Sequence, residues 1–127
     1  MALRNAMCTD KISGARMCAI IAIRGKVISF GNNQYKTHPL QATFSKNDEA
    51  VFLHAEIDSI RHAVKFINVD DLKKATLYVA RAKHDRKKGF VSGMSKPCKG
   101  CMSAIESFDI GRVVYTTDND VMVMERN

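Results

Sequence analysis

Two short stretches decide how this chain is interpreted: Leu53-His54-Ala55-Glu56-Ile57 and Pro97-Cys98-Lys99-Gly100-Cys101. The first stretch places a histidine and a carboxylate two residues apart, and the second places two cysteines three positions apart. One histidine and two cysteines are three ligands of the kind that bind zinc. A catalytic zinc site keeps three protein ligands and leaves one position for water, whereas a structural site is closed by four. The two stretches together therefore predict a zinc site with an open position.

The candidate zinc ligands are His54, Cys98 and Cys101, and Glu56 is the candidate proton carrier for a water molecule beside the metal. Both stretches fall at the starts of predicted amphipathic helices, over residues 54–66 and 98–108. The positive end of a helix lowers the pKa of a thiol, which favours metal binding by the thiolate. The two cysteines lie three positions apart, so they project from the same side of their helix.

Other interpretations of these residues are open at this point. The cysteine pair could belong to a structural zinc knuckle, or it could be a redox pair, and a single histidine is more often a core or surface residue. The presence of Glu56 favours the catalytic site. Cys8 and Cys18 are expected to have no functional role.

The order of elements predicts a single domain over residues 1–127, with a three-layer α/β/α sandwich around a mixed five-stranded sheet. A short helix is expected over Ala2–Thr9. Long loops are expected over Gly31–Asp48 and Arg81–Pro97, because these segments are polar and charged. The strands are expected over Met17–Ile23, Lys26–Phe30, Ala75–Ala80, Arg112–Thr117 and Val121–Glu125.

A formal net charge of +7 on 127 residues favours an anionic partner such as a nucleotide or a nucleic acid, although solubility alone also explains it. No apolar run approaches the length of about 20 residues that a membrane span needs. No secretory signal is visible, and the cysteine pattern favours a reduced, cytoplasmic protein. The basic residues of the second long loop are expected to surround the mouth of the site; they are Arg81, Lys83, Arg86, Lys87, Lys88 and Lys96.

The motif His-Ala-Glu followed by Pro-Cys-x-x-Cys resembles the signature of the zinc-dependent cytidine/deoxycytidylate deaminase superfamily, over about Met17 to Thr117. The resemblance implies a cytidine deaminase-like fold, zinc on the three ligands named above, and proton transfer by Glu56. It also implies that the backbone N–H of Ala55 faces the base ring. Asn33, with Asn32 as the second choice, would contact the sugar or base, with Lys36 and His38 beside it.

A histidine as the first ligand resembles the deoxycytidylate, tRNA adenosine and polynucleotide cytidine deaminases. The compact end of the chain instead resembles the nucleoside deaminases, and residues 31–39 resemble those of small phage and microbial deaminases. We expect hydrolytic deamination of a cytosine nucleotide or nucleoside, most simply one like deoxycytidylate. The alternatives are deamination of cytosine or adenine in single-stranded DNA or tRNA, and a zinc-binding protein without catalysis. The resemblance further implies a homo-oligomer.

Overall fold

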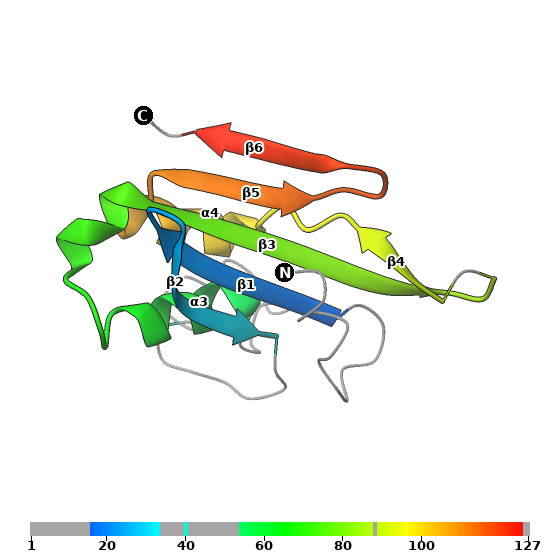
Figure 1. Cartoon of the computed structure of the whole chain (residues 1–127), viewed down its shortest axis with the longest axis horizontal. Coiled ribbons are helices and arrows are strands. Elements are labelled where there is room, and N and C mark those ends of the chain that lie inside the picture. Colours follow the sequence, from blue (N-terminus) through cyan, green and yellow to red (C-terminus); the bar gives the residue numbers. More distant parts are fainter. Residues whose placement is uncertain (1–15, 34–39, 41–53, 88, 126–127) are drawn as a thin grey trace.

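The computed structural model describes residues 16–33, 40, 54–87 and 89–125 (Figure 1). The predicted helix over Ala2–Thr9 lies outside these residues, as do Cys8, Lys36 and His38. The described elements follow one another in this order: β1 (Arg16–Ile23), β2 (Lys26–Asn32), α3 (Ala55–Ala63), a 3₁₀ helix (Val69–Lys74), β3 (Ala75–Asp85), β4 (Gly89–Gly93), α4 (Lys99–Ser107), β5 (Arg112–Thr116) and β6 (Val121–Glu125).

The strands form one mixed sheet in the order β2-β1-β3-β5-β6, with β4 paired to β3. β3 and β5 are parallel, and the other pairs are antiparallel. The parallel pair needs a crossover connection, and α4 lies within it. Arg24 and Gly25 both have positive φ angles, 52° and 79°, and form the tight turn between β1 and β2. The predicted α/β class and mixed sheet are confirmed.

The sheet has six strands and not the predicted five. The segment Arg81–Pro97 was expected to be a loop because it is rich in charge and glycine, but its first part continues β3 as far as Asp85. The chain then turns back as β4, so that Arg81 lies opposite Gly93 and Asp85 lies opposite Gly89. The turn of this hairpin projects beyond the rest of the sheet (Figure 1). A projecting hairpin has no need of an alternating apolar face, which explains why the sequence pattern concealed it.

The helices α3 and α4 pack on the same face of the sheet, where they share one apolar core with alternate residues of the strands. Ala19 and Ile21 of β1 and Leu77 and Val79 of β3 face this core and are at most 2% exposed. The remaining fully buried members come from the helices, the connections and the neighbouring strands: Ala55, Ile57, Ile60, Ala63, Leu72, Ala75, Cys101, Ala104, Ile105, Ile110 and Val113. This packing holds the first turns of α3 and α4 against the same sheet.

The opposite face of β1 is also buried, through Cys18, Ile20 and Ala22. β1 is therefore buried on both faces, and Cys18 is a core residue. Both described α-helices share one face of the sheet, so the structure describes one of the two helical layers of the predicted sandwich. Neither of these helices is long and apolar enough to cross a membrane.

A set of short contacts ties α3 to β2. Ser29 Oγ donates to the carbonyl of Ser59 at 2.8 Å, and the N–H of Asn32 donates to Asp58 Oδ2 at 3.1 Å. The Asp58 side chain is 2% exposed and also accepts from Arg61 Nε at 2.6 Å, so its buried charge is paired. β2 therefore fixes the position of the helix whose first turn carries Glu56.

Candidate metal centre and active site

The three predicted zinc ligands converge, although 44 positions separate His54 from Cys98 in the sequence. His54 Nδ1 lies 3.4 Å from Cys101 Sγ and 3.6 Å from Cys98 Sγ. The three ligand atoms all lie within 4.8 Å of one another. Around a tetrahedral zinc, with bonds of about 2.0 Å to nitrogen and about 2.3 Å to sulfur, neighbouring nitrogen and sulfur ligands are about 3.5 Å apart. The group therefore has the spacing and the donor atoms that zinc requires.

Both motifs lie at helix starts, as the sequence predicts. His54 is the residue before the first turn of α3, and Cys98 occupies the same place in α4. Cys98 Sγ accepts a hydrogen bond from the backbone N–H of Cys101 at 3.5 Å. A helix N-terminus leaves such N–H groups without partners inside the helix, so a thiolate placed there satisfies one of them.

The pKa values of the three ligand residues are shifted in different directions. Hydrogen bonds from Cys101 and His54 lower the pKa of Cys98 to about 3. The neighbouring Cys98 sulfur and burial raise the pKa of Cys101, and the hydrogen bond to Cys98 raises the pKa of His54. A proton is thus held on Cys101, and a metal ion that takes both sulfurs as ligands must displace it.

Glu56 lies in the first turn of α3, next to the ligand group, and its side chain is 3% exposed. Burial raises the pKa of its carboxyl group above the ordinary value. The residue lines a cavity of about 260 Å³ together with two of the ligands. The full described lining is Met17, Asn33, His54, Ala55, Glu56, Arg81, Met94, Lys96 and Cys98. A carboxyl group with a raised pKa therefore faces the same space as the ligand group.

A family model described as the cytidine and deoxycytidylate deaminase zinc-binding region matches residues 1–117. The chain belongs to this family. The match contains both sequence motifs, and the donor set of the site agrees with the zinc that the family binds. The resemblance predicted from the motifs is therefore confirmed, and zinc is the cofactor. No match was found among the curated proteins.

Asn33 and Ala55, two of the predicted substrate contacts, line the cavity. Asn33 is also held by β1, because its Oδ1 accepts from the N–H of Met17 at 3.0 Å and its own N–H donates to the Met17 carbonyl at 3.3 Å. These two contacts fix the strand end that borders the cavity. Lys36 and His38, the other predicted substrate contacts, lie outside the described residues.

The basic residues of segment 81–97 were expected to surround the mouth of the site together, but only some of them line the described cavity. Its two ends contribute Arg81 and Lys96 to the described lining. Arg86 and Lys87 are exposed in the turn between β3 and β4, which projects away from the sheet, and they do not belong to that lining. Met17 and Met94 were missed as lining residues, since their apolar side chains gave no sign of which space they face.

The side chain of Ser95 fixes the backbone that leads into the second motif, Pro97-Cys98-Lys99-Gly100-Cys101. β3 pairs with β5 through Val79 and with β4 from Arg81 onward, and Ser95 lies where the partner changes. Its Oγ donates to the Val79 carbonyl at 2.8 Å and accepts from the N–H of Thr116 at 2.7 Å. The Ser95 side chain is 1% exposed, so this network replaces the missing strand contacts and fixes the chain just before Pro97.

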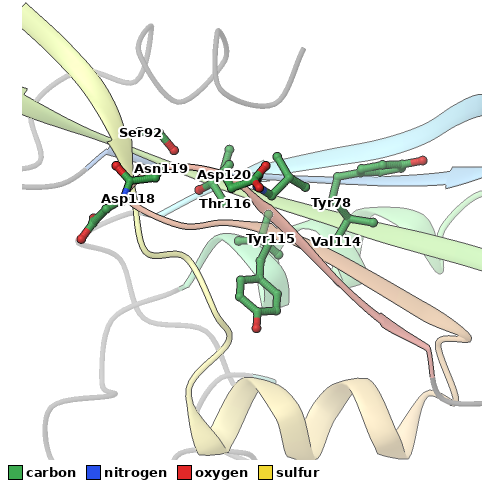
Figure 2. Close-up of a pocket in the computed structure, with 11 residues that line it drawn as sticks. Tyr78, Ser92, Val114, Tyr115, Thr116, Asp118, Asn119 and Asp120 are labelled. Atoms are coloured by element: carbon green, nitrogen blue, oxygen red, sulfur yellow. Dashed lines mark hydrogen bonds between the residues drawn. The ribbon is translucent and has the colours of Figure 1, made fainter.

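A larger cavity, of about 580 Å³, lies along β3, β5 and the turn before β6 (Figure 2). Its lining includes Tyr78, Val114 and the polar residues Asp118, Asn119 and Asp120. Figure 2 shows Tyr78 and Tyr115 pointing in different directions, with Tyr115 directed toward α4. None of the three zinc ligands belongs to its lining. The chemistry of this family member is therefore assigned to the smaller cavity.

Proposed function

We propose that the protein is a zinc-dependent hydrolase that deaminates the cytosine of a small nucleotide or nucleoside, most simply one like deoxycytidylate. The observation that carries this proposal is the position of Glu56, which is buried beside the His54, Cys98 and Cys101 group and lines one cavity with His54 and Cys98. A protein with only a structural zinc has no need of a buried carboxyl group beside an open face of the metal site. The position of Glu56 therefore also argues against a zinc protein without catalysis.

The roles of the residues follow from the reaction. His54, Cys98 and Cys101 would hold zinc, which when bound supplies an activated water for attack on an electron-poor ring carbon. The addition of water at C4 of cytosine and the departure of ammonia turn a C–NH₂ group into a carbonyl. Protons must therefore move from the water to N3 of the ring and to the departing nitrogen. Glu56 is the group placed to carry them, since its carboxyl group is buried beside the ligand group and burial raises its pKa above the ordinary value.

The N–H of Ala55 and the side chain of Asn33 support orientation of the substrate, because both residues line the cavity beside the ligands. In this proposal Ala55 contacts a polar atom of the base, and Asn33 contacts the sugar or the base. Lys36 and His38, which follow Asn33 closely in the sequence, remain proposed substrate contacts.

The proposal is tested by incubating the zinc-loaded protein with free cytosine, deoxycytidine, deoxycytidylate and a cytosine-containing single-stranded oligonucleotide. Replacement of an amino group by an oxygen raises the mass of a product by about one unit, which mass spectrometry detects. We expect this change in deoxycytidylate or deoxycytidine, accompanied by release of ammonia. A protein that carries zinc and changes none of the four compounds would contradict the proposal.

The second candidate is deamination of a base in single-stranded DNA or tRNA. The net charge of +7 and the exposed Arg86 and Lys87 at the projecting hairpin favour it, because a strand of phosphates would contact several cations. Turnover of the oligonucleotide alone, with binding that falls steeply as salt is added, would replace the first candidate with this one.

We further propose that the protein acts in the cytoplasm, in nucleotide metabolism, as a homo-oligomer. An apolar row crosses the sheet on the face away from α3 and α4, where Phe30, Tyr78 and Val123 are 57%, 39% and 47% exposed. The strand register aligns these residues through Ile20 and Val114. A second copy of the chain could cover such a row. Sedimentation of the zinc-loaded protein as a monomer would remove this part of the proposal.

A further inference from the structure

Arg81 occupies an unusual position for a cation. It lies on β3, opposite Met17 of β1 and Gly93 of β4, and is therefore in the interior of the sheet. Its side chain is only partly exposed and lines the cavity that contains His54 and Glu56. A charged side chain in such a place is unfavourable unless a partner compensates for its lost hydration.

The described residues do not supply that partner. Arg81 Nε is buried and has no hydrogen-bond partner among them. The contact from Nη1 to the Met94 carbonyl is 3.5 Å long, at the limit of a hydrogen bond. No carboxylate among the described residues forms an ion pair with Arg81. A buried donor without a partner, on the wall of a cavity, indicates a group that the cavity is built to receive.

The acidic and basic residues that line the cavity differ in their exposure to solvent. Glu56 is buried, whereas Lys96 is exposed and Arg81 is partly exposed. Glu56 therefore lies on an enclosed part of the cavity wall, and the two cations lie on more exposed parts of it. A ligand that fits this arrangement has an uncharged ring at one end and an anion at the other.

We propose that Arg81, assisted by Lys96, binds the phosphate group of a cytosine mononucleotide and so selects the nucleotide over the nucleoside. This inference rests on the proposed deamination. A guanidinium group matches phosphate geometry, because two of its N–H donors can bond to two phosphate oxygens at once. One phosphate needs only these two cations. The exposed cations of the hairpin turn, Arg86 and Lys87, do not belong to the described lining, which favours a mononucleotide over a strand.

The test compares kcat/KM of the zinc-loaded protein for deoxycytidine 5′-monophosphate and for deoxycytidine. Arg81→Gln should lower the value for the monophosphate by roughly 10- to 100-fold, mainly through KM, which is the range for a lost charge-assisted hydrogen bond. The value for deoxycytidine and the zinc content should stay unchanged, and Arg81→Lys should restore part of the loss. An equal fall for both substrates, or an unchanged ratio between them, would overturn the inference.

Arg24→Gln is the matched control, since it removes the same charge from an exposed turn at the other end of β1 from Met17. It should leave the preference for the monophosphate unchanged. The variant Arg86→Gln distinguishes the phosphate of a mononucleotide from the phosphates of a nucleic-acid strand. A loss on a cytosine-containing oligonucleotide as large as that of Arg81→Gln, without turnover of the monophosphate, would overturn the mononucleotide assignment in favour of a strand.

A binding measurement separates this inference from the proposed function. Inorganic phosphate should protect the zinc-loaded protein against thermal unfolding, and Arg81→Gln should weaken phosphate binding at least about 10-fold. If phosphate binds in this way but no cytosine compound is turned over, the proposed deamination fails and the phosphate site stands. If the protein deaminates deoxycytidylate and Arg81→Gln binds phosphate as tightly as the wild type, the inference fails and the function stands.

Discussion

The variant Glu56→Gln should retain zinc and lose deamination. Glutamine keeps nearly the same shape in the buried position but cannot take up or release a proton, so the reaction loses its proton carrier. Positioned acid and base groups contribute roughly 10²- to 10⁴-fold to rates, and a loss of at least about 100-fold in kcat is expected. The measurement is kcat on the best substrate, together with the zinc content of the same sample.

Glu106→Gln is the control for this experiment, because Glu106 is an exposed carboxylate on α4. It should leave both kcat and the zinc content unchanged. If Glu56→Gln binds zinc fully and still turns over substrate at the rate of the wild type, Glu56 is not the proton carrier. If it loses zinc, its role is structural, and the assignment from its position in the cavity is wrong.

The variant Gly31→Ala should destabilise the fold and disturb the metal site at the same time. A Cβ atom at Gly31 would meet the backbone nitrogen of Ser59, the carbonyl oxygen of Ala55 at 2.6 Å and Asp58 Cβ at 2.8 Å. These atoms belong to α3, so β2 and the helix must separate to admit the methyl group. We expect a loss of at least about 2 kcal/mol in the free energy of unfolding, together with weaker zinc binding.

Gly25→Ala provides the comparison. No atom lies within 4 Å of a Cβ atom at Gly25, but its φ of 79° disfavours any other residue. It should cost about 1 kcal/mol of stability and leave zinc affinity unchanged. Denaturant unfolding and zinc titration of both variants distinguish these effects. Equal stabilities, or an unchanged zinc affinity in Gly31→Ala, would show that close contact between β2 and α3 does not position the site.

The metal site could be predicted from the sequence because its chemistry is local. His54, Cys98 and Cys101 are recognisable by donor type, and the helix pattern after each motif places them at helix starts. The parallel pair of β3 and β5 follows in the same way from the helix between them. These features depend on residue spacing and on ligand chemistry, which the linear sequence carries directly.

Features that depend on distant contacts could not be predicted. The charged hairpin of β3 and β4 was expected to be a loop, because charge and glycine are typical of loops and nothing in the sequence shows strand pairing there. The expected loop start at Gly31 is instead the end of β2, pressed against α3. Ser95 bridges β3 and β5 through backbone groups that no pattern identifies. The position of Arg81 in the cavity wall can be inferred only when β3 is known to continue past Ala80 and to include Arg81.

The most direct test is the zinc content of the purified protein, measured by elemental analysis after exposure to zinc and removal of the excess. Three ligands at the observed spacing predict about one zinc per chain. Cys101→Ser should lose most of that zinc, whereas Cys18→Ser, which changes a buried cysteine outside the site, should keep it if the variant folds. A well-folded wild-type protein that holds no zinc, or a Cys101→Ser variant that holds as much as the wild type, would contradict the assignment of a zinc centre at His54, Cys98 and Cys101.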